Sequence, residues 1–144
     1  PTPLPGWLDV PASGLAAAAC TILVGGSLQG VLPALLANLV VQAGERVCRW
    51  VGLPDAVADL IAGANAVFCA TLLNRWLDVP VGPVVAGGIM ILVPGLAFTN
   101  ALRDAIAGDL VSATARGLEA FVKVTALAAG VGAALYLVGG GAVW

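Results

Sequence analysis

The feature that most constrains this chain is a run of 35 residues, 10–44, that contains no charged side chain. A transmembrane helix takes roughly 20 apolar residues, within a range of about 17–25. The run is therefore too long for one straight span, and the pair Gly25-Gly26 interrupts it near its middle. Because glycine readily adopts turn conformations, we predict a hairpin of two membrane helices, residues 7–28 and 31–50.

The composition identifies the bilayer as the solvent of this chain. Of its 144 residues, 60% are hydrophobic and 10% are charged, and the mean hydropathy is +1.04. Soluble domains carry about 25% charged residues. Six Lys and Arg stand against eight Asp and Glu, without the basic cluster that a nucleic acid would need. Cys20, Cys48 and Cys69 match no metal or redox spacing and the chain has no His, so we expect no metal and no cofactor.

Three further apolar segments, residues 54–73, 84–106 and 112–138, complete the predicted fold. We therefore predict one all-α membrane domain over residues 1–144, with five transmembrane helices. The fourth of these is expected to be broken at Pro94-Gly95.

The distribution of arginine predicts the orientation. Cytoplasmic loops carry an excess of Lys and Arg. With five spans, Arg46, Arg49, Arg103 and Arg116 lie on the side of the N-terminus, and Arg75 alone lies on the other side. The N-terminus is thus predicted in the cytoplasm and the C-terminus outside. Arg46 and Arg49 are interpreted as interfacial anchors at the end of the second span.

The break in the fourth span is the sharpest functional signal. Pro94 cannot donate a backbone hydrogen bond, and Gly95 allows a further bend. Non-helical backbone at membrane depth is tolerated only where it is buried in protein or lines a water-filled cavity. Transporters place such breaks at substrate sites, because half-helix ends offer partial charges there. A simple proline kink is the alternative.

Polar residues beyond the break extend this predicted half-site. Thr99, Asn100, Arg103 and Asp104 lie within about one and a half turns and share one side of a helix. They offer a cation, an anion and an amide to a small zwitterion or carboxylate. Asn65, near the middle of the third span, must find partners inside the protein, so either substrate contact or an interhelical hydrogen bond would explain it. The predicted substrate-binding set is Pro94, Gly95, Thr99, Asn100, Arg103, Asp104 and Asn65.

A second group of charges is predicted to act in coupling or gating. An ionisable group at bilayer depth costs roughly 2.5–3.5 kcal/mol on insertion scales. Arg116, Glu119 and Lys123 form one helical stripe that could pair with the Arg103-Asp104 turn. Either a structural clamp between two helices or a role in substrate passage would explain this stripe. Asp59, one turn into the third span, is a further candidate.

The segment LVPGLAFTNALRDAIAGDLVSATARGLEAF resembles the first membrane domain of the threonine/serine exporter family. Members of that family show a Pro-Gly pair in an apolar run, an Asn, an Asp four residues later, a Gly-Asp or Gly-His pair, and an Arg that opens the final helix. The matching positions are Pro94, Gly95, Asn100, Asp104, Gly108, Asp109 and Arg116. The resemblance adds Asp109 to the expected coupling or gating residues.

The resemblance implies an exporter subunit in a bacterial inner (plasma) membrane. Family members usually carry a soluble domain before the first helix, which is missing here, and work with a second membrane domain or subunit. Fused members are associated with threonine and serine export, and a two-subunit form with succinate export. The nearly balanced charges around the predicted site favour a small amino acid, with a dicarboxylate such as succinate as the alternative.

Other classes of function are less well supported. A non-transporting membrane scaffold, whose polar stripe only joins helices, remains an alternative. No metal site, nucleophile–base pair or phosphate-binding loop indicates an enzyme. The expected partners are the lipid bilayer, the second membrane subunit or domain, and the small substrate, and the sequence leaves a homo-oligomer open.

Overall fold

The computed structural model describes residues 6–78 and 80–139, and every regular element in these ranges is helical. The all-α prediction is therefore confirmed for the described residues. In chain order the elements are α1 (Gly6–Leu23), α2 (Leu28–Val51), α3 (Asp55–Leu77), α4 (Val81–Ile89), the 3₁₀ helix η1 (Met90–Leu92), α5 (Gly95–Ile106) and α6 (Leu110–Gly139).

The predicted count of five spans is not confirmed. In the described ranges, three helices, α2, α3 and α6, are long and apolar enough to cross a membrane. A fourth crossing results if the bent pair Val81–Leu92 and Gly95–Ile106 is counted as one span. The predicted first span, 7–28, ends earlier than expected, because the chain turns after Leu23 through Gly25, which has a φ of 93°. The apolar part of α1, Pro11–Leu23, is shorter than the other candidate spans.

The predicted break in the fourth span is present and longer than a single kink. Helix α4 ends at Ile89, η1 continues as a tighter turn, and α5 begins at Gly95 after a bend of 57°. Pro94 has no N–H to bond to the carbonyl of Met90, and the N–H of Val93 bonds to that oxygen instead at 3.3 Å. The backbone therefore leaves α-helical geometry before the proline.

Helix α3 also differs from its predicted span of 54–73. It continues to Leu77 and is closed by Asp78 in a left-handed conformation, with a φ of 51°. Residues 74–77 have no helix-breaking side chain, so the helix continues until Pro80 approaches.

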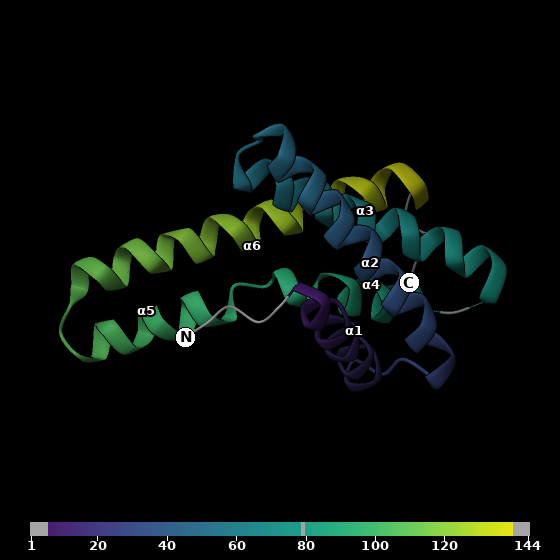
Figure 1. Cartoon of the computed structure of the whole chain (residues 1–144), viewed down its shortest axis with the longest axis horizontal. Helices are drawn as coiled ribbons and strands as arrows, with labels where there is room; N and C mark the ends of the chain where they lie inside the picture. Colours follow the sequence, from purple (N-terminus) through teal and green to yellow (C-terminus); the bar gives the residue numbers. More distant parts are fainter. Residues whose placement is uncertain (1–5, 79, 140–144) are drawn as a thin grey trace.

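The helices form a bundle with a projecting arm (Figure 1). The bundle contains α1 to α4 and the second half of α6, and α3 packs against α6 along the same direction. We call α5 together with residues 110–124 of α6 the arm, which extends away from the bundle in Figure 1. Gly108, with a φ of 86°, lies in the turn that joins the two helices of the arm.

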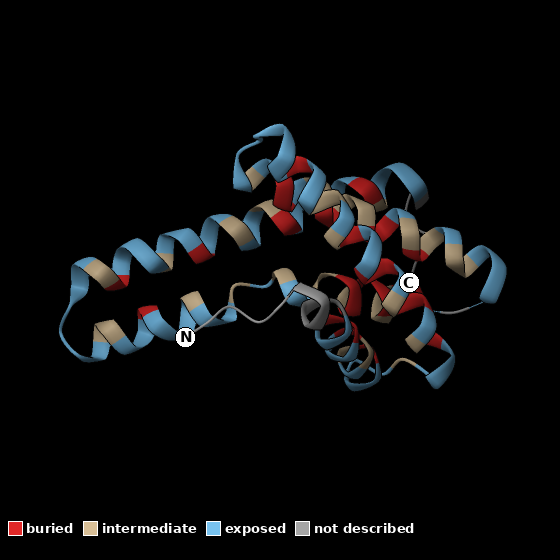
Figure 2. Ribbon diagram, viewed as in Figure 1, coloured by how far each residue is buried: buried red, intermediate tan, exposed pale blue. Residues whose placement is uncertain are grey.

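Small side chains fill the core of the bundle. Alanine and valine dominate the residues with less than 1% exposure: Ala34, Ala37, Val41, Ala62, Ala66, Val67, Ala70 and Val84. Buried residues concentrate where α1 to α4 meet α6, and the arm is mostly exposed (Figure 2). In lipid, small residues allow helix backbones to approach closely, which supplies packing energy where the hydrophobic effect does not act.

The contact between α3 and α6 depends on two glycines. A Cβ on Gly63 would lie 2.5 Å from the carbonyl oxygen of Leu127, and a Cβ on Gly130 would overlap the carbonyl oxygen of Leu60. Each neighbour is backbone, which cannot rotate away as a flexible side chain can. Only glycine therefore fits at these two positions without separating the helices.

We predict that Gly130→Ala destabilises the protein by about 1–3 kcal/mol, the usual range for overpacking. Gly132→Ala is the matched control, since it changes the same helix two residues later and its Cβ would meet no atom within 4 Å. Thermal unfolding in detergent micelles should show a lower Tm for Gly130→Ala and an unchanged or higher Tm for Gly132→Ala. Equal Tm values for the two variants would contradict this packing.

Candidate functional site

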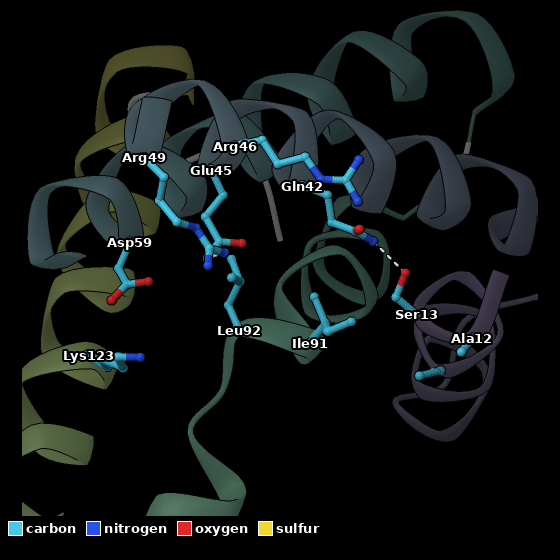
Figure 3. Close-up of a pocket in the computed structure, with 11 residues that line it drawn as sticks. Ala12, Ser13, Gln42, Glu45, Arg46, Arg49, Asp59, Ile91, Leu92 and Lys123 are labelled. Atoms are coloured by element: carbon cyan, nitrogen blue, oxygen red, sulfur yellow. Dashed lines mark hydrogen bonds and ion pairs between the residues drawn. The ribbon is translucent and has the colours of Figure 1, made fainter. Parts of the chain in front are cut away.

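A polar cavity of about 860 Å³ lies between α1, α2, α3, η1 and α6 (Figure 3). Five of its eleven lining residues are charged, in a chain that is only 10% charged. The lining residues are Ala12, Ser13, Ala16, Gln42, Glu45, Arg46, Arg49, Asp59, Ile91, Leu92 and Lys123. We call this space the polar cavity.

Helix α2 supplies one wall of the polar cavity. Gln42, Glu45, Arg46 and Arg49 follow the spacing of three, four and seven residues that places side chains on one face of a helix. Arg49 forms an ion pair with Glu45, one turn earlier. Arg46 and Arg49, which are predicted from the sequence as interfacial anchors, thus also line a cavity within the bundle.

Asp59 is a buried carboxyl group that lines the polar cavity. Asp59 is only 5% exposed, and its Oδ2 atom has no hydrogen-bond partner among the described residues. An ionised carboxylate without a partner in a low-dielectric interior is costly. In Figure 3 its carboxyl group lies on the cavity side of α3, above Lys123. The geometry therefore leaves a carboxylate that a cationic group could satisfy.

Lys123 reaches the polar cavity from α6 (Figure 3). Within the part of the chain that the structure describes, no ion pair joins it to Asp59. Opposite charges thus line one space without a direct ion pair between them. Such an arrangement can receive a ligand that carries both signs of charge.

The end of the polar cavity away from Asp59 and Lys123 combines uncharged polar side chains with Arg46, whose guanidinium group lies near Gln42 in Figure 3. The Oγ of Ser13 on α1 accepts hydrogen bonds from Asn38 Nδ2 at 3.1 Å and from Gln42 Nε2, both on α2. Ser13 and Asn38 are buried, and Gln42 is partly buried. Ser13, Asn38 and Gln42 are not among the site residues predicted from the sequence. The available signal was the presence of two amides one turn apart inside the uncharged run, where polar groups must find partners within the protein.

The predicted break residues lie beside the polar cavity and do not enter it. Ile91 and Leu92 of η1 line it. Pro94 and Gly95 instead line a second cavity of about 380 Å³, whose other lining residues are Val93, Phe98, Gly117, Ala120, Phe121 and Val124. This second cavity lies between α5 and α6 and is apolar. It offers an amino acid no charged partner.

The polar turn after the break lies on the arm. Thr99, Asn100 and Arg103 are exposed, and the Thr99 hydroxyl donates to the carbonyl of Gly95 at 2.7 Å. Asn65 lies elsewhere, at the α2–α3 contact, where its Nδ2 would be 2.7 Å from a Cβ on Gly44. The structure does not gather the predicted substrate-binding residues around one space, and their roles remain predictions.

One predicted contact across the arm is present. Oδ2 of Asp104 lies 3.2 Å from Nε of Arg116, which joins α5 to α6. The contact is an ion pair without hydrogen-bond geometry, since the same oxygen has no hydrogen-bond partner among the described residues. Glu119 is exposed and forms no ion pair in those ranges, and Lys123 points into the polar cavity instead. The predicted stripe of Arg116, Glu119 and Lys123 therefore does not act as one unit. Arg116 contacts α5, and Lys123 lines the polar cavity.

Asp109 precedes α6 and caps it. Hydrogen bonds from the Ser112 hydroxyl and from the Ser112 backbone N–H hold the pKa of Asp109 below its ordinary value of 3.8. The backbone bond to Asp109 Oδ1 is 3.1 Å long. Such a side chain satisfies an N–H group that the start of a helix leaves unpaired. Its expected role in coupling or gating remains a prediction.

These features define an all-helical, multi-pass membrane protein with a charged cavity inside its bundle. The chain belongs to the threonine/serine exporter family, since the family model described as "Putative threonine/serine exporter" matches residues 1–138. A threonine/serine exporter of Corynebacterium glutamicum is 28% identical over 142 residues, which are 95% of this chain and 28% of that protein. The chain thus spans little more than a quarter of the length of this relative. No solved structure matches the chain. The expected family is confirmed.

The Asp109 cap predicts a pH dependence of the arm. Because its pKa is lowered on folding, the contact contributes fully above about pH 3.8 and is lost as the pH falls through the lower folded value. Amide hydrogen exchange at residues 110–113, corrected for intrinsic rates, should therefore accelerate as the protein is acidified below pH 3.8. Asp109→Asn keeps a capping side chain without a titrating group, so its exchange should not show this acceleration. An identical acid response in both proteins would contradict the assignment.

Proposed function

We propose that this chain is part of an exporter of small amino acids such as threonine and serine, with the polar cavity as its substrate site. The observation that carries the proposal is the buried carboxylate of Asp59, whose Oδ2 has no partner among the described residues and which lines a cavity together with Lys123. The chain's membership of an exporter family supports the transport of a solute.

The charges of the polar cavity favour a zwitterion. Asp59 would bind the ammonium group of the substrate, and Lys123 on α6 would bind its carboxylate. Removal from water strengthens both contacts, because Coulomb energy rises as the effective dielectric constant falls. A dicarboxylate has no cationic group to bind the Asp59 carboxylate, so the succinate alternative is less favoured.

The dimensions and the boundary of the cavity fit a transport site. Ligand sites commonly enclose about 300–1,000 Å³, and the polar cavity has about 860 Å³. One of its borders is η1, the non-α turn next to the 57° bend. Transporters bind substrates beside interrupted helices of this kind. We infer that movement of α4 and α5 about η1 opens and closes the site.

The remaining elements of the proposal concern coupling, orientation and partners. Asp59 would also carry a proton in exchange for the substrate, since the chain has no His. The arginines near the polar cavity would lie toward the cytoplasm of a bacterial inner membrane, as the positive-inside rule favours. A second membrane domain or subunit of the same family would complete the transport path, since the related exporter is much longer than this chain.

The scaffold alternative retains support at the arm. The Asp104–Arg116 ion pair joins two helices, and Arg116 has a half-exposed side chain. An exposed ion pair contributes only about 0–1 kcal/mol. We therefore propose that Asp104 and Arg116 hold the arm together, and that Arg103 and Asp104 are secondary candidates for substrate contact.

The central prediction is that Asp59→Asn lowers the affinity for L-threonine at least about tenfold, because a hydrogen bond to a charged group contributes roughly 1.5–3 kcal/mol. Binding of radiolabelled L-threonine to the purified chain in lipid nanodiscs would measure this loss. Asp55→Asn is the matched control, since Asp55 is one turn earlier on α3, exposed, and outside the cavity lining. The Tm of Asp59→Asn should not fall, because the variant removes an uncompensated buried charge.

Efflux provides the second measurement. Cells that naturally make this protein would carry each variant in place of the native gene and be loaded with labelled L-threonine. Asp59→Asn should reduce efflux as it reduces binding, and Asp55→Asn should not. If Asp104→Asn abolishes efflux while Asp59→Asn leaves it intact, the substrate site lies on the arm and the polar cavity is wrongly assigned. Loss of efflux only in proportion to loss of Tm would support the scaffold alternative.

A further inference from the structure

The hydroxyl of Ser13 holds two amide groups of α2 at the end of the polar cavity away from Asp59 and Lys123. Asn38 and Gln42, one turn apart, both donate to Ser13 Oγ. Asn38 is fully buried and does not line the cavity, whereas Gln42 does. Asn38 therefore helps to fix the serine, and the serine in turn fixes the amide of Gln42.

The Gln42 amide retains unused hydrogen-bonding capacity. Its Nε2 is directed to Ser13, and its Oε1 forms no hydrogen bond within the described ranges. A primary amide has two N–H donors and one carbonyl acceptor. With one donor assigned to Ser13, a donor and the acceptor remain for another group. A substrate hydroxyl, which both donates and accepts, matches that pair.

The position of Gln42 in the cavity indicates which part of a substrate it would meet. Figure 3 shows Asp59 and Lys123 at one end of the polar cavity, and Gln42, Ser13, Ala12 and the guanidinium group of Arg46 at the other. A substrate whose ammonium and carboxylate groups contact Asp59 and Lys123 directs its side chain toward the end that Gln42 occupies.

We propose that Gln42 recognises the side-chain hydroxyl of the substrate, and that Ser13 and Asn38 are its positioning residues. This inference rests on the proposed function and adds the residue that separates hydroxy amino acids from apolar ones of the same size. A site built to hydrogen-bond a hydroxyl discriminates strongly against the analogue without it, because the polar groups of the site are then left unpaired.

The test compares pairs of substrates that differ by the hydroxyl. L-threonine and L-valine are nearly isosteric, and L-serine and L-alanine differ by one oxygen atom. Each would compete with radiolabelled L-threonine for the chain in nanodiscs, and each would serve as the labelled ligand where threonine binds weakly. The native chain should prefer the hydroxy member of each pair by at least tenfold.

Gln42→Leu should reduce that preference to less than about threefold, mainly through weaker threonine binding, while valine binds as well as or better than before. Gln29→Leu is the matched control, because it makes the same change on the same helix at an exposed position outside the cavity lining. Ser13→Ala, which keeps Gln42 but removes its hydrogen-bond partner, should give an intermediate preference.

The outcomes separate this inference from the proposed function. If the native chain prefers threonine to valine and Gln42→Leu shows the same preference, Gln42 does not recognise the hydroxyl. This result would overturn the inference and leave the proposed function intact. If Gln42→Leu does not fold, an unchanged preference in Ser13→Ala overturns it equally. If the native chain binds none of the four amino acids, the proposed substrate site is wrong and the inference fails with it.

Discussion

The close backbone contact between α3 and α6 is the interaction on which the rest of this structure depends. Gly63 and Gly130 allow each helix to approach a carbonyl oxygen of the other. Asp59 directly precedes Leu60 at this contact, and Lys123 lies one turn before Leu127. Because the two helices run in the same direction (Figure 1), the contact brings a carboxylate and an ammonium group to the same cavity.

Packing through small residues also explains how the bundle can enclose a large polar space. The core consists mainly of alanine and valine, so the helices are held by backbone proximity and not by interlocking large side chains. Charged and amide side chains then fit where the helices diverge, at the end of the bundle formed by α2, α3 and η1. The uncompensated carboxylate of Asp59 is stable there only if the cavity admits water or a ligand.

The sequence predicted the elements better than it predicted the site. Hydropathy and the Gly and Pro positions located the helical segments approximately. The missing N–H of Pro94 was enough to predict the interruption near that residue. The assignment of the site to the arm rested on neighbours in sequence, Thr99 to Asp104, which helical spacing does bring together. The polar cavity instead combines residues from α1, α2, α3 and α6. Its members are separated by up to 111 positions, from Ala12 to Lys123, and no local pattern indicates which of them meet.

The sequence by itself determined the membrane environment, the helical class, the broken fourth segment and the family. These follow from composition, from the fixed requirement that backbone groups bond within a helix in lipid, and from local motifs. Only the tertiary structure decided that Asp59 faces Lys123 without pairing, that Ser13 joins Asn38 to Gln42, and that Arg103 lies away from them. Helix rotation and crossing determine those positions, and both depend on close contacts between residues distant in the chain.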